Sequence, residues 1–365
     1  MTHFKVLFIS RASLFRDRGG DTIQILETAK HLERLGVTVD IKLCNEKIDY
    51  SPYALIHFFN IIRPADILIH IKKSAKPYVV STIYVDYSET ERNQRKGVAG
   101  VLVKLLSKDA TEYFKVIARF LLNGERIISP AYIFFGQKRS IRRIIRKAKM
   151  LLPNSENEYK RLSKDYHLRA PYTVIPNAIN SEIFREYKEY IPRNDVMVLC
   201  VGRIEYRKNQ LNLIRALNNT KYKLLIIGSA SPNQQQYVEN CRKIAAPNIS
   251  FIDSLPQEKL LQYYRTAKVH ALPSWFETTG LSSLEAAAMG CNVVITDKGD
   301  TKEYFENYAF YCDPSSPASI FVAIEMAASS GFNELLRETI YSKYTWPNTA
   351  ERTFEVYRNI IEGTF

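Results

Sequence analysis

The chain has 365 residues, of which 46% are hydrophobic and 24% charged, and this length and composition predict two folded domains and exclude a disordered chain or a fibrous repeat. No apolar run reaches the roughly 18 residues of a membrane-spanning helix, and the run at residues 6–9 is too short for a secretion signal. The excess of 51 Lys and Arg over 38 Asp and Glu favours a polyanionic neighbour: nucleic acid, anionic lipid or a phosphorylated ligand.

The cysteines indicate the compartment. They are odd in number and include no CxxC pair, which predicts buried thiols in the reducing cytoplasm. They are Cys44, Cys200, Cys241, Cys291 and Cys312.

Short β-rich runs alternate with stretches of helical period, the pattern of parallel sheets flanked by helices. Strands are expected at residues 5–10, 37–43, 65–71, 78–85, 150–153 and 172–176, and again at 195–201, 223–228, 249–252, 269–273, 292–296 and 309–312. A charged linker, residues 180–194, separates the two series. The sequence therefore predicts an α/β fold with two doubly wound, Rossmann-like domains, 1–180 and 195–345, which face each other across a cleft at the carboxyl ends of their strands.

Residues 92–149 do not follow this alternation of strands and helices, because the segment is too long and too helical for one crossover. Twelve basic and three acidic residues lie between positions 101 and 150, a local excess of +9. Residues 104–121 have the period of an amphipathic helix, and Tyr132, Phe134 and Phe135 are interleaved with the later charges. We interpret the segment as a helical insertion with a membrane-surface patch; the alternative is a solvated basic face over an ordinary core helix.

The most informative stretch, Phe276 to Gly290, follows an expected strand. Its composition favours a helix that begins near Gly280 and ends at Gly290. The free amides and the positive dipole end of such a helix bind phosphate without a side chain, and Gly280 allows a ligand to approach the backbone.

Glu277 and Glu285 flank the start of this helix, eight positions apart, which places the carboxylates on the order of 10 Å from each other. That length suits a nucleotide sugar: one carboxylate can bind the ribose and the other the sugar ring, with the phosphates over the amides between them. The alternative is two solvent-facing glutamates near a helix start, where acidic residues are favoured.

Two cations follow the first strand of the second series. Arg203 leaves the carboxyl end of that strand, and Lys208 stands beside the next helix start. Both can converge on one diphosphate and neutralise its charge during bond cleavage, and either can also be ordinary surface charge.

In the first domain, Gly19 and Gly20 lie in a turn between a strand and a helix, where they admit a phosphate or a sugar or serve only the turn. Neither GxGxxG nor GxxxxGK[ST] occurs, which disfavours a P-loop hydrolase. There is no HExxH, DxD or GxSxG either, so we expect neither a metal site nor a serine hydrolase.

Together these motifs resemble the retaining GT-B glycosyltransferases of glycosyltransferase family 4, the glycosyl transferases group 1, over nearly the whole chain. The matching residues are Glu277 and Glu285 for the E-x7-E element, Arg203 and Lys208 for the phosphate-binding cations, and Gly19 and Gly20 for the N-terminal glycine loop. The resemblance implies a GT-B fold whose final helix, residues 346–365, crosses back to the first domain. Family members often carry a His near the end of the fourth strand, where this chain has Tyr84 or Asp86.

The resemblance also implies where a donor would bind. Glu285 would bind the ribose and Glu277 would contact the transferred sugar, while Gly280, Leu281 and Ser282 would offer their amides to the diphosphate. The reaction would move a hexosyl unit from a nucleoside-diphosphate sugar to a glycan or lipid-linked glycan in cell-surface polysaccharide synthesis. Retention by front-face attack and retention through a covalent intermediate both remain open.

No separate cofactor and no essential metal are expected for this reaction, because the cations and the helix dipole can neutralise the leaving diphosphate. The basic insertion suggests peripheral contact with anionic lipid at the inner face of the cytoplasmic membrane, and no nucleic acid is expected as a partner. Two alternatives stay open: an inactive GT-B scaffold that binds anionic lipid or RNA through its insertion, and an epimerase or phosphorylase of the same architecture.

Overall fold

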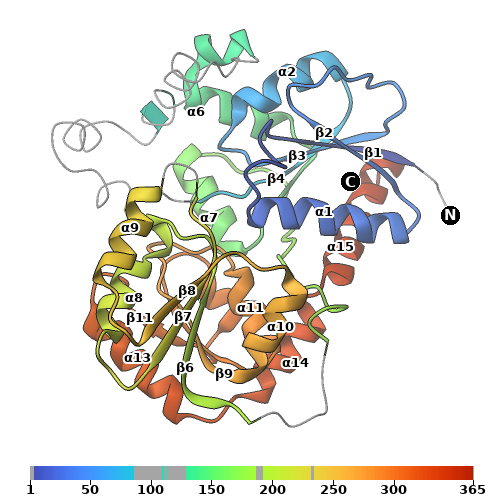
Figure 1. Ribbon diagram of the computed structural model, residues 1–365. Coiled ribbons are helices and arrows are strands. Elements are labelled where there is room, and N and C mark those ends of the chain that lie inside the picture. Colours follow the sequence, from blue (N-terminus) through green and yellow to red (C-terminus); the bar gives the residue numbers. More distant parts are fainter. Residues whose placement is uncertain are drawn as a thin grey trace. The chain divides into compact units, whose positions relative to one another are not determined.

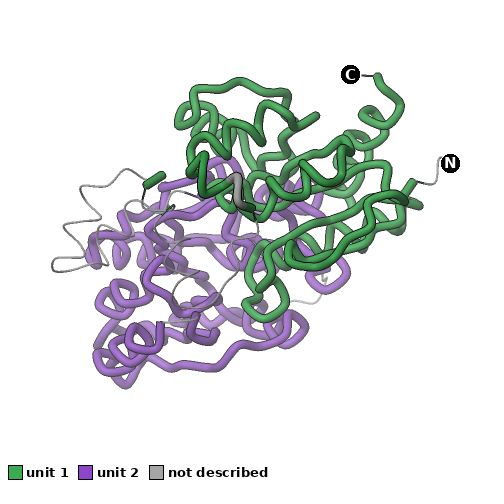
Figure 2. The backbone as a smooth tube through the Cα atoms, turned by 90° about the horizontal axis from the view of Figure 1, so that it is seen from above, with its two compact units in different colours: residues 1–84, 91–176, 347–365 green, residues 85–90, 177–346 purple. Residues whose placement is uncertain are grey.

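The structure is a computed structural model that describes residues 4–85, 109–110, 113, 129–185, 192–231 and 234–364. It divides into two compact units, which Figure 2 colours separately. Unit 1 comprises residues 1–84, 91–176 and 347–365, and unit 2 comprises residues 85–90 and 177–346. Each unit contains a parallel sheet with helices around it (Figure 1), which confirms the predicted α/β class.

Unit 1 is built on a five-stranded sheet in the order β2-β1-β3-β4-β5, with every pair of neighbours parallel. Its strands are β1 (Lys5–Ser10), β2 (Thr38–Leu43), β3 (Leu55–Phe59), β4 (Tyr78–Ser81) and β5 (Met150–Leu152). The described helices are α1 (Gly20–Arg34), α2 (Pro64–Ser74), α6 (Pro130–Lys147), α7 (Glu156–Tyr166) and α15 (Trp346–Glu362). The strand order reverses between β1 and β3.

Two of the predicted strands in this unit are wrong. Residues 65–71 form most of α2, because Pro64 lacks a backbone N–H and starts a helix rather than extending a central strand. The third strand is β3 instead, and all five of its residues are buried. Residues 172–176 make only an isolated bridge between Leu151 and Tyr172. Thr173 and Ile175 donate to the carbonyls of Leu151 and Pro153, but Pro171 and Pro153 have no N–H with which to continue a ladder.

From Pro347 onward, α15 counts with unit 1. Tyr357 of this helix is fully buried, and its hydroxyl lies 2.5 Å from Nδ1 of His57 on β3. At the start of the helix, the Thr349 hydroxyl donates to the carbonyl of Pro176 (2.8 Å). These contacts tie the end of the chain to the sheet and to the last segment of unit 1 before residue 177.

Helix α6 is the part of the predicted insertion that the structure describes. The helix expected over residues 104–121 lies outside the described residues, except for Asp109, Ala110 and Tyr113, which are helical. Gly136 interrupts α6 with φ +66° and ψ −177°, so the axis bends there. No helix among the described residues is both long and apolar enough to cross a membrane.

Unit 2 is built on a six-stranded parallel sheet in the order β11-β10-β9-β6-β7-β8. Its strands are β6 (Asn194–Val201), β7 (Lys223–Ile227), β8 (Ile249–Ile252), β9 (Ala267–Leu272), β10 (Asn292–Thr296) and β11 (Phe310–Cys312). The described helices are η1 (Tyr206–Lys208), α8 (Gln210–Leu217), α9 (Gln235–Ile244), α10 (Gln257–Thr266), α11 (Leu281–Ala288), α12 (Thr301–Phe305), α13 (Pro317–Ser329) and α14 (Glu334–Lys343).

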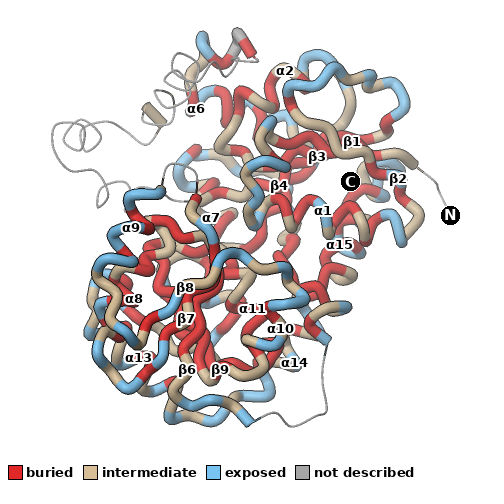
Figure 3. Tube along the Cα trace, viewed as in Figure 1, coloured by how far each residue is buried: buried red, intermediate tan, exposed pale blue. Residues whose placement is uncertain are grey.

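The centre of unit 2 is a continuous buried layer, which Figure 3 shows along its strands. All five residues of β10 are buried, as a parallel strand covered on both faces requires. Helix α11 is a core helix, because every residue from Ser283 to Ala288 is buried. Packing therefore fixes the position of α11, whose first turn is part of the site described below.

Candidate functional site

The candidate site lies at the carboxyl edge of the unit 2 sheet, where the strand order reverses between β6 and β9. Doubly wound sheets bind ligands at such points, because the loops after the two central strands diverge there. The segment after β6 carries Arg203 and Lys208, the segment after β9 carries Glu277, and α11 follows with Glu285. Unit 2 thus brings the predicted donor-side residues to one edge.

The backbone around Glu277 is fixed by the segment that follows β10. The Glu277 N–H donates to the carbonyl of Lys298 (3.1 Å), and the Asp300 N–H donates to the carbonyl of Glu277 (3.0 Å). Gly299 lies between these two bonds with φ +108°, and a Cβ there would lie 2.0 Å from the Glu277 carbonyl oxygen. Only glycine permits this close approach.

The Glu277 side chain is buried and ionised. Its residue is 4% exposed, so the solvent-facing alternative is wrong. Lys208 Nζ lies 2.5 Å from Oε2, the Ser274 hydroxyl donates to the same oxygen (3.1 Å), and Arg207 Nη1 lies 3.7 Å from Oε1. Burial alone would raise the pKa of Glu277, but the charges of Lys208 and Arg207 lower it to about 2.

Glu285 is buried as well, at 6% exposed, so the solvent-facing alternative is wrong here too. Both of its oxygens accept hydrogen bonds from neutral donors on α10: Gln257 Nε2 to Oε1 (2.6 Å) and the Tyr264 hydroxyl to Oε2 (3.0 Å). Burial raises the pKa of Glu285 to about 7, and these two hydrogen bonds only partly oppose the rise. Neither Gln257 nor Tyr264 could be identified from the sequence, because no motif marks them.

The first turn of α11 lies between the two carboxylates in the sequence. Gly280 precedes the helix at φ +73°, a conformation that other residues adopt with strain, and a Cβ there would lie 3.4 Å from Glu277 Cγ. Leu281 and Ser282, the first two helical residues, are half-buried, and their amides have no carbonyl partner within the helix. The predicted helix start is confirmed, and its amides can accept an anion.

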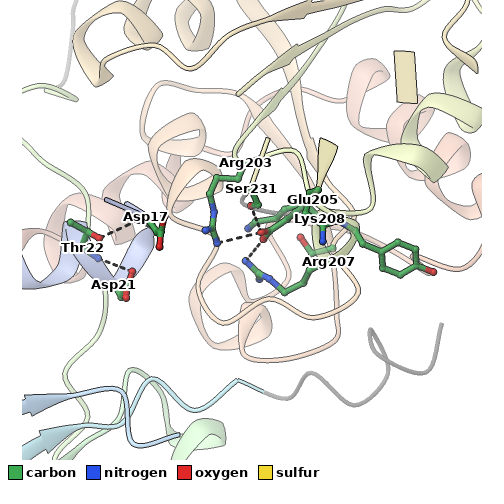
Figure 4. A network of polar contacts seen from close by, with 12 residues as sticks. Asp17, Asp21, Thr22, Arg203, Glu205, Arg207, Lys208 and Ser231 are labelled. Carbon is green, nitrogen blue, oxygen red and sulfur yellow. Dashed lines mark hydrogen bonds and ion pairs between the residues drawn. The ribbon is translucent and has the colours of Figure 1, made fainter. Parts of the chain in front are cut away.

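Arg203 is linked to Arg207 through Glu205 (Figure 4), and Arg207 is linked through Glu277 to Lys208. Glu205 and Arg207 were not among the predicted site residues. Arg203 Nη2 lies 3.4 Å from Glu205 Oε2, and Arg207 Nη2 lies 3.0 Å from Glu205 Oε1. The Ser231 hydroxyl also donates to Oε2 of Glu205 (2.5 Å). No spacing rule marks Glu205 and Arg207, because Arg207 lies in the short helix η1 (Tyr206–Lys208) and not in an extended segment that continues from Arg203 and Glu205.

The two cations differ in exposure. The Arg203 side chain is 40% exposed, whereas that of Lys208 is 13% exposed and its ammonium is paired with Glu277. Arg203 is therefore the more accessible cation for an incoming anion. Lys208 can bind an anion only by sharing its charge with Glu277.

The predicted glycine pair belongs to unit 1. Gly19 precedes α1 and Gly20 is its first residue; the Gly19 N–H donates to the Thr22 hydroxyl (3.2 Å). Gly19 has φ −149°, an extended conformation open to any residue, so the turn itself does not require glycine there. The Asp21 carboxylate that follows is bound by Arg11 Nε (2.7 Å), which fixes the start of α1.

Tyr84, one of the two residues named for the position where family members often carry a His, is 1% exposed, and its hydroxyl donates to Asp165 (2.5 Å). It holds α7 against the end of β4, a structural contact. Asp86, the other residue named for that position, lies outside the described residues.

Other candidate groups for chemistry are buried in the core. The five cysteines are buried and free, as predicted. Burial lowers the pKa of both His57 and His270 to about 3, so both rings are neutral. Within the described ranges, no three His, Cys, Asp or Glu side chains come together in a way that could hold a metal ion.

Comparison with known proteins relates this part of the chain to one family. Residues 182–346 match the family model described as glycosyl transferases group 1. The matched segment, just under half of the chain, is similar to this family. It contains Arg203, Lys208, Glu277, Glu285 and the whole of α11.

Two curated relatives span different shares of the chain. An uncharacterized glycosyltransferase of Methanocaldococcus jannaschii is 31% identical over 182 residues, which cover 46% of this chain and 46% of the relative. The N-acetylgalactosamine-N,N'-diacetylbacillosaminyl-diphospho-undecaprenol 4-alpha-N-acetylgalactosaminyltransferase of Campylobacter jejuni is 25% identical over 311 residues, with 80% and 81% coverage. The chain spans about half the length, 46% and 55%, of the first curated relatives that it matches.

The whole chain is similar in fold to a solved structure. Sucrose-phosphate synthase from Thermosynechococcus elongatus superposes with a TM-score of 0.75 at 17% identity, over 99% of this chain and 100% of that one. The fold of the chain is therefore the GT-B fold that the sequence predicts.

Proposed function

We propose that this chain transfers a hexosyl unit from a nucleoside-diphosphate sugar to an acceptor hydroxyl and retains the anomeric configuration. The observation that carries the proposal is the pair of buried carboxylates around the start of α11, Glu277 held by cations and Glu285 held by neutral donors. The family match over the same residues supports it.

The diphosphate of the donor binds at the first turn of α11 and at Arg203. The amides of Leu281 and Ser282 and the positive end of the helix attract its charge without a side chain. Arg203 and Lys208 then neutralise the charge that develops on the leaving diphosphate, which lowers the barrier to cleavage of the glycosidic bond. Since these groups do the work of a divalent cation, we propose that no metal is essential and that no separate cofactor takes part.

The two carboxylates hold the two sugars of the donor. A carboxylate accepts hydrogen bonds from neighbouring hydroxyls through both oxygens, so Glu285 binds the ribose and Glu277 binds the transferred sugar. Retention follows either front-face attack, in which the leaving phosphate takes the acceptor's proton, or a covalent intermediate.

A thermal-shift panel tests the donor site. We expect one of UDP, GDP, ADP and TDP, and its sugar conjugate, to raise the melting temperature in the presence of a chelator, because a ligand that binds only the folded state stabilises it. A shift that needs a divalent cation would contradict the metal-independent site. No shift with any nucleotide would favour the inactive scaffold instead.

The stereochemistry of the product tests the reaction itself. With the donor identified by the panel, proton NMR of the transferred or released sugar, recorded before mutarotation, is expected to show the anomer of the donor. The opposite anomer would contradict a retaining transferase.

On the acceptor side, we propose a glycan or lipid-linked glycan used in cell-surface polysaccharide synthesis, reached at the inner face of the cytoplasmic membrane. The Campylobacter jejuni relative is named for a diphospho-undecaprenol acceptor, which supports a lipid-linked substrate. Helix α6 offers a surface for such a membrane. It has no acidic residue, and Phe134 and Ile133 at its start are 81% and 51% exposed.

The α6 basic surface consists of exposed cations along the helix. They are Lys138, Arg139, Arg143, Arg146 and Lys147. Basic charge attracts anionic headgroups at about 1 kcal/mol per cation near the surface, and an apolar side chain beside it enters the headgroup region. Exposed cations beside an exposed Phe134 fit an anionic bilayer better than a purely solvated face, because a solvated face gains no stability from exposing an aromatic ring.

Vesicle sedimentation tests this surface. Changing Arg139, Arg143 and Arg146 to Gln is expected to abolish binding to phosphatidylglycerol-rich vesicles at low salt, whereas the control with Lys160, Lys164 and Arg169 changed to Gln, exposed cations of the same unit, keeps most of it. Equal binding by the two triple variants would contradict a role for α6.

A further inference from the structure

Five charged side chains of alternating sign form one connected network in unit 2, and Figure 4 shows part of it. We call it the charge network. In order of contact its members are Arg203, Glu205, Arg207, Glu277 and Lys208. The members at its two ends are cations, so an anionic ligand can bind at either end, while Arg207 lies in the middle between two carboxylates.

All members of the charge network except Arg203 are shielded from water. The side chains of Glu205, Arg207, Lys208 and Glu277 are 12%, 18%, 13% and 6% exposed. In such surroundings a carboxylate that loses its counter-ion pays a large desolvation cost, and the loss either protonates it or moves it. Glu277 therefore needs a cation beside it at every stage of a reaction cycle.

Lys208 alone cannot supply Glu277 with a full positive charge throughout the reaction cycle. When a diphosphate binds, the ammonium of Lys208 must divide its charge between the phosphates and Glu277, so its hold on the carboxylate weakens. Arg207 is the other cation beside Glu277. Its Nη1 lies 3.7 Å from Oε1, whereas Lys208 Nζ lies 2.5 Å from the other carboxylate oxygen, Oε2.

The other contacts of the Arg207 guanidinium fix its orientation. Its Nη2 is bound to Glu205 Oε1 (3.0 Å), and its Nη1 donates to the carbonyl of Phe276 (3.2 Å), the residue before Glu277. Glu205 is itself held by the Ser231 hydroxyl (2.5 Å) and is 9% exposed. These contacts hold the guanidinium beside the Glu277 carboxylate and the Phe276 carbonyl, so it does not turn toward the phosphates of a bound donor.

We propose that Arg207, fixed by Glu205, is the positioning residue for Glu277, which it keeps ionised and in place while the donor's diphosphate takes up the charge of Lys208. The inference rests on the proposed function, because it assigns Glu277 to the transferred sugar. It makes Glu205 and Arg207 part of the transfer machinery although neither contacts the sugar.

The titration of Glu277 depends on every group that faces its carboxylate. The segment before α8 presents Lys208 and Arg207 with Glu205 behind it, the segment after β9 presents the neutral Ser274, and the segment after β10 contributes backbone bonds from Lys298 and Asp300. Only Arg207 and Lys208 supply positive charge to the carboxylate itself within 4 Å among the described residues.

The test compares Arg207→Gln with Arg337→Gln. Arg337 is a matched control, since it is an ion-paired arginine of unit 2 with the same 18% side-chain exposure but pairs with Glu334 (2.7 Å) on α14. In Arg207→Gln we expect the affinity for the nucleoside diphosphate to stay within about threefold and kcat with the nucleotide sugar to fall by at least about tenfold. Arg207→Lys restores most of kcat, because it returns the charge.

A second readout needs no turnover. With carbon-labelled glutamate, the Glu277 carboxyl signal is assigned by its absence in Glu277→Gln and followed against pH. Its pKa is expected to rise toward the ordinary range in Arg207→Gln, to change little in Arg207→Lys, and to stay low in Arg337→Gln. If Arg207→Gln does not fold, Arg207→Met takes its place in both measurements, because it also removes the charge and keeps an unbranched side chain.

Two results would overturn the proposal: a Glu277 titration that does not move in Arg207→Gln, or a nucleoside diphosphate affinity that falls as far as kcat, which would make Arg207 a phosphate ligand. If the wild-type protein turns over no nucleotide sugar, the proposed function fails, and the Glu277 titration still decides whether Arg207 positions this carboxylate.

Discussion

Glu277 and Glu285 flank the same helix start, and both are almost completely buried, yet their surroundings are opposite in kind. Glu277 has Lys208 at 2.5 Å and Arg207 at 3.7 Å, and its pKa falls to about 2. Among the described residues, Glu285 is hydrogen-bonded only by the amide of Gln257 and the hydroxyl of Tyr264, and its pKa rises to about 7. Burial by itself pushes both carboxyls toward the neutral form, so the partners decide the sign.

The difference has a chemical use. A permanently ionised carboxylate beside cations suits the sugar end of a donor, where charge develops during transfer. A carboxyl group that titrates near neutral pH, among neutral donors, can release a proton when ribose hydroxyls replace its present partners. In the proposed function the same residue type, eight positions along the chain, would serve two tasks because different neighbours surround it.

The largest expected effect comes from removing each carboxylate. Glu277→Ala leaves the Lys208 ammonium buried without its counter-ion, while Arg207 keeps Glu205, so it is expected to lower the free energy of unfolding at pH 7 by about 3–5 kcal/mol. Glu285→Ala leaves only neutral donors unpaired and is expected to cost about 1–3 kcal/mol. Urea unfolding of the two variants measures both values.

The double variant Glu277→Ala with Lys208→Met serves as the control for that measurement. It removes the uncompensated ammonium together with the carboxylate, so it is expected to recover a large part of the loss. Equal losses for the two single variants would show that the cations at Glu277 are not what distinguishes the sites.

The second effect concerns the backbone that holds Glu277. Gly299→Ala places a Cβ 2.0 Å from the Glu277 carbonyl oxygen, so the segment must move away and take the carboxylate with it. We expect the affinity for the nucleotide sugar to fall by about 100-fold, since misplacement by about 1 Å has effects of this size. Calorimetric titration measures it.

Gly331→Ala is the matched control for Gly299→Ala, because Gly331 is in unit 2 and a Cβ there meets nothing within 4 Å. It should bind donor like the wild type. Wild-type affinity in Gly299→Ala would mean that the close approach of the two segments does not position Glu277.

The sequence predicted most of the fold because hydrophobic period and turn residues are local signals. It failed at residues 65–71, where an apolar run reads as a strand and only Pro64 marks the helix start, and at 172–176, where the prolines prevent a ladder. The helix start at Gly280 was found because glycine and the alanine-rich turns that follow it carry the information locally.

The predicted site residues were located by their spacing, but their partners were not. Lys208 and Glu277 lie 69 positions apart, so no spacing rule could show that the two charges pair. Arg207 and Glu205 look like ordinary surface charges until the fold buries them, and Gly299 is constrained only by the backbone of Glu277, on another segment. Such contacts are tertiary, which is why sequence pattern does not reveal them.

The smallest expected effect is the pH dependence of donor affinity, which Glu285 should control. Because its pKa is about 7, the ionised fraction increases as pH rises from about 6 to about 8, and only the ionised form accepts hydrogen bonds from two ribose hydroxyls at full strength. The affinity for the nucleotide sugar is expected to rise by about tenfold over this range, as calorimetry at the two pH values would show.

In Glu285→Gln, the same calorimetric measurement should show weak binding of the nucleotide sugar, with an affinity that does not change with pH. The sugar conjugate is the better probe, because its diphosphate carries no terminal phosphate that titrates in this range. An affinity that falls with rising pH in the wild type would contradict the assignment of Glu285 to the ribose.

The most direct test of the account compares two ligands on three proteins. The dissociation constants of the nucleoside diphosphate and of its sugar conjugate are measured for the wild type, Glu277→Gln and Glu285→Gln. If Glu285 holds the ribose and Glu277 the transferred sugar, Glu285→Gln weakens both ligands alike and Glu277→Gln weakens only the sugar conjugate. Equal loss of both ligands in Glu277→Gln, or unchanged binding in Glu285→Gln, would contradict it.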